Sequence, residues 1–317
     1  MSTAPTSLSG STPNTPTHHR ERPFYALFLR LLAVLGFSVM FTGGKLASEH
    51  GVNLVEIVFY RQLLAMPVVV ASILLGPGLA SIRTDNFRLH IGRATLGLIG
   101  IFLNFLAFVM LPLAEATTIG FSMPIFATIL SAVLLREPTG IHRWAAVLLG
   151  FTGVLVIAQP GTHFDMPING VGVAITAAIL TAFVSILIRK MGKTETPTTI
   201  VFWFCALPIP PLLCLMPFFG QAHDGVTWAI LVTIGISGGF SQLLMTLSLR
   251  WGPVALVLPM DYSNLIWATL FGWLFWNKWP APTTWIGAAL IVASGLYIAL
   301  REHKRLREIR NAVPIVT

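Results

Sequence analysis

Long apolar runs separated by short polar ones make up most of this chain. A helix needs about 20 mostly apolar residues to cross a bilayer, so each run predicts one membrane-spanning helix. Ten runs can be counted: 24–47, 54–76, 92–110, 113–135, 142–159, 168–190, 198–219, 226–249, 253–276 and 283–300. The pattern predicts an all-α membrane protein with ten transmembrane helices, five in each half.

The composition agrees with this prediction. The 317 residues are 55% hydrophobic and 10% charged, and their mean hydropathy is +0.79. Soluble domains carry about 25% charged residues. Cys205 and Cys214 are the only cysteines, and nine residues on one helix separate them too far for a disulfide.

The two halves of the chain resemble each other at a separation of 141 residues. The matched residues include Pro112 with Pro253, Ser122 with Ser263 and Trp144 with Trp285. Five helices per half make the second half start on the opposite side of the membrane, so the repeats are inverted. A duplicated hydrophobic half is typical of secondary transporters, whose substrate site lies between the two repeats.

The chain divides into four segments. Residues 1–23 are rich in Ser, Thr and Pro, which predicts a disordered cytoplasmic tail. Residues 24–160 form the first repeat and residues 161–302 the second. Residues 303–317 form a basic cytoplasmic tail that we expect to lie against the anionic inner leaflet.

Basic residues set the orientation. With ten helices, 17 of the 20 Lys and Arg residues lie on the side of the N-terminus, Lys45 and Lys278 lie on the other side, and Arg61 lies inside the membrane. This bias places both termini in the cytoplasm. The net charge of +8 therefore reflects membrane orientation, and no nucleic-acid partner is expected.

Proline and ionisable residues mark unusual positions within the helices. Four prolines in 208–217 predict a kinked or broken seventh helix. Asp261 and Arg61 lie deep in the ninth and second helices, where charges are costly and often functional. Arg30, Lys45 and Glu56 are nearer helix ends, where their charged groups are expected to reach the interface.

Asp261 has three interpretations. It binds a cationic or hydrogen-bonding group of the substrate, or it carries a proton, or it is a structural partner of Arg61 or of a backbone donor. Tyr262, Asn264 and Trp267 surround it in sequence and favour a binding site. Arg61 is suited to clamp a carboxylate or phosphate, because a guanidinium offers two parallel donors. Alternatively, it pairs with an acidic side chain: Glu56, Glu115 or Asp261.

Asn104 and Gln242 are amides inside the third and eighth helices, and either interhelical hydrogen bonding or substrate contact accounts for them. The candidate substrate-binding residues are Arg61, Asn104, Ser122, Gln242, Asp261, Tyr262, Asn264 and Trp267. No Walker loop, zinc motif or catalytic triad motif is present, so no enzyme activity, cofactor or metal is expected. The alternatives to a transporter are a membrane-embedded enzyme using Asp261 and Arg61, or a non-transporting scaffold.

The same segments resemble a known family. Residues 111–138 with 142–161, and residues 252–280 with 283–302, each resemble the end of an EamA repeat of the drug/metabolite transporter superfamily, and "FYRQLLAMPVVV" at 59–70 is similar to its second helix. The family often has Gly-Glu after the ninth helix, where this chain has Asn277-Lys278. After the fourth helix the acid is kept as Glu137, but Arg136 replaces the Gly.

The resemblance implies ten helices in two inverted repeats around a central cavity, and transport of a small organic molecule without ATP. It is strongest to bacterial members of the riboflavin- and S-adenosylmethionine-importer type. It thereby implies a multi-pass protein of the bacterial inner membrane, embedded in the lipid bilayer. Substrate, direction, a coupling proton and a homodimer are left open.

Overall fold

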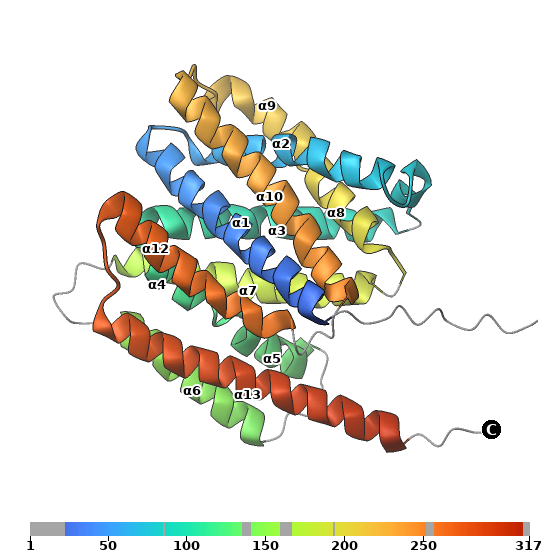
Figure 1. Cartoon of the computed structure of the whole chain (residues 1–317), viewed down its shortest axis with the longest axis vertical. Helices are drawn as coiled ribbons and strands as arrows, with labels where there is room; N and C mark the ends of the chain where they lie inside the picture. The colour runs from blue at the N-terminus through green and yellow to red at the C-terminus, as the bar shows by residue number, and fades with distance from the viewer. Residues whose placement is uncertain are drawn as a thin grey trace, which may run out of the picture.

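The computed structural model describes residues 23–312, apart from 85, 135–140, 159–166, 193 and 252–256. The elements in this part of the chain are α-helices and two short 3-10 helices, η1 and η2 (Figure 1). They are α1 (Pro23–Glu49), α2 (Leu54–Leu74), η1 (Leu79–Ile82), α3 (Phe87–Met110), α4 (Leu113–Gly120), α5 (Met123–Leu134), α6 (Ile141–Ala158), α7 (Ile168–Met191), α8 (Pro197–Ala206), α9 (Ile209–Phe219), α10 (Gly225–Trp251), η2 (Leu258–Ser263), α12 (Asn264–Trp276) and α13 (Pro282–Ala312).

These elements account for the expected membrane spans. Among the described residues, seven helical stretches are long and apolar enough to cross a membrane, and residues 144–158 and 282–298 are shorter apolar helices. The ninth span comprises η2 and α12, and its predicted first residues, 253–256, lie outside the described part. The predicted all-helical membrane fold is confirmed. The N-terminal tail and the Arg136-Glu137 pair also fall outside the described residues.

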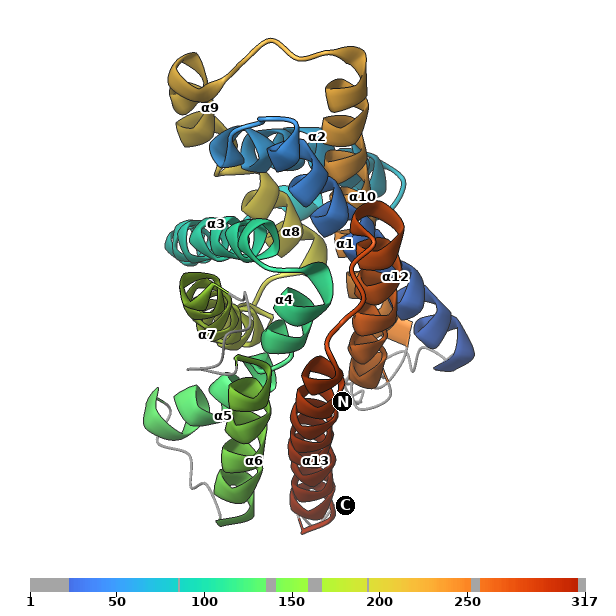
Figure 2. The same cartoon turned by 90° about the vertical axis from the view of Figure 1, so that its left-hand side faces the viewer.

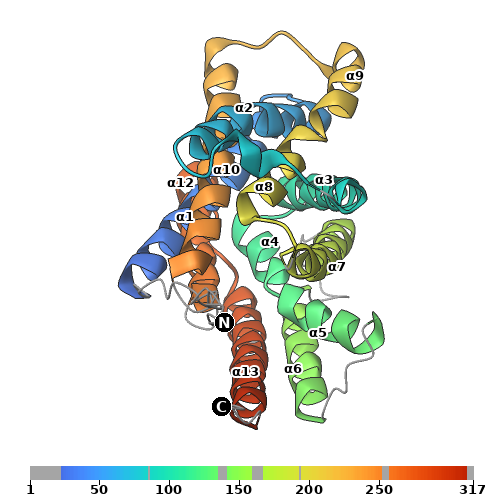
Figure 3. The ribbon, with the colours of Figure 1, turned by 90° about the vertical axis from the view of Figure 1, so that its right-hand side faces the viewer.

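The two repeats interlock by reciprocal contacts. The first helix of the first repeat, α1, packs along the third helix of the second repeat, α10. In the same way α7, which begins the second repeat, packs along α3 of the first. Figures 2 and 3 show α1, α10 and α12 on one side of the molecule and α3, α4 and α7 on the other. Each repeat therefore packs its first helix against the third helix of the other repeat.

Several spans are interrupted. The seventh span breaks at Leu207 and Pro208 into α8 and α9, as its prolines predicted. The fourth breaks between Gly120 and Met123, and the ninth is a 3-10 helix at the equivalent position. Ser122 donates to the carbonyl of Ile119 and Ser263 to that of Met260, each at 2.6 Å. The fourth and ninth spans therefore share one local structure, which the hydropathy pattern did not reveal.

The fifth spans of the two repeats, α6 and α13, pack against each other at one end of the molecule (Figure 1). Their backbones approach closely at two glycines, because a Cβ atom on Gly287 would lie 2.6 Å from the carbonyl oxygen of Gly153. Ser294 donates to the carbonyl of Ala146 at 2.6 Å. The helix continues beyond the expected end at 300 as far as Ala312, so part of the predicted basic tail is helical.

Replacing Gly287 by valine should push α6 and α13 apart, because the new side chain meets backbone that cannot rotate away. Forced packing of this kind costs about 1–3 kcal/mol. We expect a lower midpoint of thermal unfolding in detergent for Gly287→Val. Ala289→Val, at an exposed position of the same helix, is the control. Equal midpoints for both variants would show that the close contact is unimportant.

Candidate functional site: the seam between α1 and the ninth span

A line of polar contacts joins α1 to η2 and α12. Toward the start of α1, Arg30 donates to Asp261 through two parallel hydrogen bonds, Nε to Oδ1 at 2.6 Å and Nη2 to Oδ2 at 2.5 Å. The Arg30 side chain is 7% exposed and that of Asp261 is 40% exposed. Bidentate geometry of this kind is the strongest form of an arginine–carboxylate pair. It ties the first span of one repeat to the fourth span of the other.

The next contact along the seam is a hydrogen bond from the Ser38 hydroxyl to the Asn264 side-chain oxygen. Beside it is a void of about 10 Å³ that also touches Thr42 and Thr117. Its apolar walls are Phe41, Phe108, Leu113 and Ala268. A void this small has room for about one water molecule. The passage is therefore almost closed at the level of Ser38.

Beyond this constriction the seam widens into a cavity of about 380 Å³. Ligand pockets occupy about 300–1,000 Å³, so a small metabolite fits. Lys45 donates to the Leu111 carbonyl at 2.5 Å and its ammonium lies 5.5 Å from the Trp276 ring, while the Trp276 indole donates to Glu49 at 2.6 Å. The other walls include residues 109–115 and 278–280, with Glu115, Lys278 and Trp279 among them. The cavity is rich in charges of both signs and in indole rings.

The cavity lies at one face of the membrane. Its walls come from the ends of α1, α3 and α12 and from the starts of α4 and α7. These helix ends lie on the face opposite the one where α1 begins. The Arg30–Asp261 pair lies on the other side of the constriction, toward the start of α1. The seam is thus wide toward one face and joined by polar pairs toward the other.

The structure brings two of the predicted site residues to the seam and places Tyr262 and Trp267 in the same span beside them. Asp261 and Asn264 contact α1 directly. Tyr262 stands edge-on to Phe121 at 5.1 Å between ring centroids, next to the break in the fourth span. The Trp267 indole N–H is buried and finds no hydrogen-bond partner in the described part of the chain. An orphaned buried donor of this kind is available to a water molecule.

Arg61 lies in α2, away from the α1 seam, and does not pair with Asp261, Glu56 or Glu115. It is 2% exposed within α2 and donates to the side chain of Gln62. Its guanidinium lies 5.4 Å from the Phe204 ring, and that of Arg93 lies 4.1 Å from the same ring. The acidic-partner interpretation of Arg61 is therefore wrong for this conformation. The interpretation as an anion clamp stays a prediction.

The remaining predicted residues make local or interhelical contacts. Asn104 donates to the Gly100 carbonyl at 2.8 Å and approaches the Thr181 hydroxyl at 3.5 Å. Ser122 is buried and serves the turn described above. Gln242 is half-buried on α10, and its backbone carbonyl accepts from the Thr246 hydroxyl at 2.9 Å. None of the three lines either void.

Sequence reasoning missed Arg30 and Ser38. Arg30 was expected to extend toward the interface, and this expectation is wrong because the residue is 6% exposed and bound to Asp261. Glu56 is likewise wholly buried, in contact with His223. Both residues were visible as charges within apolar runs. Distance from a helix end alone could not show which face of the helix they occupy. No group of three or more His, Cys, Asp or Glu residues in the described ranges could hold a metal ion.

Interlocked helical repeats, interrupted spans and a polar seam with a metabolite-sized cavity define a multi-pass membrane carrier. The model of the EamA-like transporter family matches residues 24–159 and again 168–300, so the chain belongs to this family. It is a membrane transporter of small metabolites, embedded in the lipid bilayer, and not an enzyme.

Two relatives share the greater part of the chain. It is 28% identical to a riboflavin transporter of Vibrio cholerae, over 92% of this chain and 98% of the relative. It is 31% identical to a riboflavin transporter of Rhizobium johnstonii, over 73% of this chain and 76% of the relative. A solved crystal structure, 21% identical, superposes with a TM-score of 0.57 over 84% of this chain and 96% of that one. The similarity to this solved structure concerns the fold alone.

The Arg30–Asp261 pair should be measurable as an energetic coupling. Removing Asp261 leaves the buried Arg30 charge unpaired, and removing Arg30 costs Asp261 two hydrogen bonds, so Arg30→Gln and Asp261→Asn should each lower the stability of the protein. The double variant should lose less than the sum, by an interaction energy on the order of 1 kcal/mol. Thermal unfolding of the four proteins in detergent checks this. Arg301→Gln, at an exposed position, serves as control, and strict additivity would contradict the pair.

Proposed function

We propose that this protein is a secondary transporter of riboflavin, or of a flat ring-containing metabolite of similar polarity, across the bacterial inner membrane. Two relatives that cover most of the chain bear the name riboflavin transporter. The observation that carries the proposal is the cavity of about 380 Å³, in which Trp276 and Trp279 offer ring surfaces and Lys45 and Glu49 offer charges. Planar heterocycles bind well between aromatic faces and a few polar groups.

Transport in this proposal works by alternating access along the α1 seam. The conformation described is open on the side of the cavity and closed by Ser38–Asn264 and Arg30–Asp261 on the other side. Opening toward the opposite face requires α1 and the ninth span to separate, which breaks both contacts. Asp261 then acts chiefly as the partner of Arg30, a structural role with a partner other than the expected Arg61 or backbone donor. A coupling proton and a homodimer stay predictions.

Both termini lie in the cytoplasm in this proposal, so the cavity opens to the outside. The basis is the distribution of Lys and Arg given by the sequence. An outward-facing cavity beside the aromatic residues 276 and 279 suits a carrier that collects its substrate from outside the cell. Import is therefore the proposed direction.

The substrate proposal predicts a specific effect at Trp276. Replacing it by leucine removes a ring from the cavity wall, which should weaken riboflavin binding roughly tenfold. Trp285→Leu is the matched control, because Trp285 is an exposed tryptophan on the peripheral α13. Binding is measured with the purified proteins and uptake with proteoliposomes. If the wild type fails to bind riboflavin but other metabolites raise its unfolding temperature, the substrate is wrong and the carrier is not.

The orientation has its own test. A reporter that is active only in the cytoplasm, fused after Thr317, should be active. The same reporter inserted at the exposed Gly51, between α1 and α2, should be silent. The reverse result at the two positions would place the cavity on the cytoplasmic face and make the import proposal untenable.

A further inference from the structure

Away from the α1 seam, two buried pairs of glutamate and histidine join the repeats at opposite faces of the membrane. On the face of the cavity, Glu56 near the start of α2 contacts His223, two residues before α10, with 2.7 Å between Oε1 and Nε2. On the other face, Glu195 just before α8 faces His90 near the start of α3, with 3.7 Å between Oε2 and Nε2. All four side chains are at most 6% exposed. None of them belongs to the proposed transport site.

The two pairs are related by the symmetry of the repeats. Glu56 belongs to the second helix of the first repeat, and its histidine precedes the third helix of the second repeat. Glu195 precedes the second helix of the second repeat, and its histidine lies on the third helix of the first. The partners are thus exchanged between repeats in the same way at the two faces. Two unrelated contacts between the repeats would not be expected to exchange their partners in this way.

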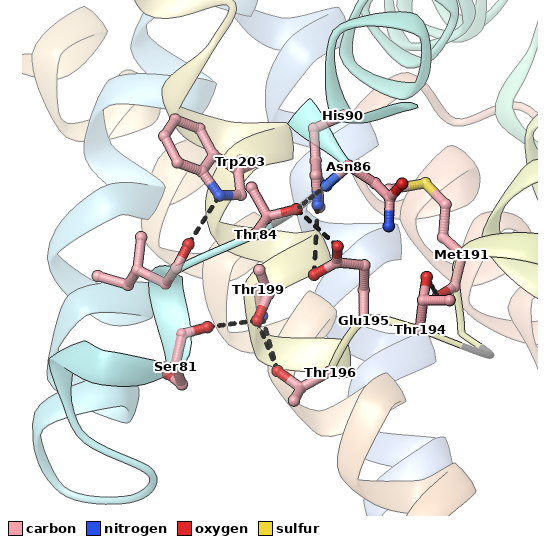
Figure 4. A network of polar contacts seen from close by, with 11 residues as sticks. Ser81, Thr84, Asn86, His90, Met191, Thr194, Glu195, Thr196, Thr199 and Trp203 are labelled. Atoms are coloured by element: carbon pink, nitrogen blue, oxygen red, sulfur yellow. Dashed lines mark hydrogen bonds and ion pairs between the residues drawn. The ribbon is translucent and has the colours of Figure 1, made fainter. Parts of the chain in front are cut away.

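Each pair fastens a connection between helices. The outer pair holds residues 220–224, between α9 and α10, against α2. The inner pair is part of a wider network (Figure 4), in which Thr84 donates to Glu195 at 2.6 Å and the Trp203 indole donates to the Ile82 carbonyl at 3.0 Å. Thr199 also bonds to the Ser81 carbonyl. Releasing Glu56 would free the connection between α9 and α10. Releasing Glu195 would free Thr84, which lies between η1 and α3.

Both pairs also contain unsatisfied polar atoms. Glu56 Oε2 and both ring nitrogens of His90 are buried and have no hydrogen-bond partner in the described part of the chain. A buried carboxylate beside an imidazole is held more tightly when the imidazole carries a proton, because the neutral contact becomes an ion pair. Histidine is the side chain that gains or loses its proton between about pH 5 and 8.

We propose that the outer pair is a proton-binding site, in which Glu56 fastens residues 220–224 when a proton from solvent binds the His223 imidazole. In the conformation described, the outer pair is within hydrogen-bond distance and the inner pair is not. An exchange of conformation between the two repeats, which would open the carrier to the other face, would exchange the tight and loose pairs as well.

Other charges near the two pairs differ. Around the outer pair, the titratable groups on neighbouring elements are His50, Tyr60 and Asp224. Hydrogen bonds from Thr227 lower the pKa of the Asp224 carboxyl, so it stays ionised over the range in which histidine titrates. Around the inner pair, the described charged groups on the adjoining elements are basic: Arg83, Arg88, Arg93 and Lys190. The nearby Asp85 lies outside the described residues.

Amide hydrogen exchange of the full-length protein in detergent tests the proposal without any substrate, so its outcome is independent of the riboflavin assignment. After correction for the intrinsic exchange rate, residues 220–228 should be several-fold better protected at pH 6 than at pH 8. Glu56→Gln and His223→Gln should each abolish this difference. His50→Gln, which changes an exposed histidine on the same face, should preserve it.

The inner pair provides a second comparison. His90→Gln should leave the pH difference of residues 220–228 intact. Equal protection at both pH values in the wild type would overturn the proposal, as would a difference that survives in His223→Gln.

Discussion

Hydrocarbon offers no partner to a polar group, and this constraint accounts for most of the contacts described here. A buried charge or hydroxyl is stabilised when it finds a donor or acceptor within the protein. In this chain the charged partners come from the opposite repeat: Arg30 with Asp261, Glu56 with His223, and His90 with Glu195. Neither repeat satisfies these groups alone. The polar residues therefore fix how the two halves sit together, and the apolar surfaces fill the space between them.

The hydrophobic pattern predicted the membrane-spanning helices, and the residue matches at a separation of 141 predicted their arrangement as two repeats. Spans of about 20 apolar residues have few alternatives in a bilayer. The break in the seventh span was also predictable, because proline removes a backbone donor. The interruptions of the fourth and ninth spans were not. Their sequence signals are weaker: a serine shared by both, Ser122 and Ser263, with Gly120 and Pro124 beside the first and Pro259 before the second.

The site was predicted in part. Asp261 and Asn264 stand out as polar residues deep in an apolar span, and the structure places both at the seam with α1. Their partners Arg30 and Ser38 did not stand out, since depth along a helix says nothing about which neighbour a side chain faces. The same limit applies to Arg61. It is as deep as expected, yet its guanidinium packs over Phe204 instead of reaching an acid.

The 3-10 form of η2 also determines how the seam is spaced. In a 3-10 helix residues three apart are eclipsed, and each residue rises about 2.0 Å instead of 1.5 Å. Asp261 and Asn264 consequently point the same way, about 6 Å apart along the axis. Their partners on α1, Arg30 and Ser38, are eight residues and so about 12 Å apart. The long arginine side chain makes up the difference, which a lysine or a shorter side chain could do only with a single-point contact. The 3-10 turn in the ninth span thus reduces the offset that the arginine side chain has to span to about 6 Å, from about 7.5 Å for a regular α-helix.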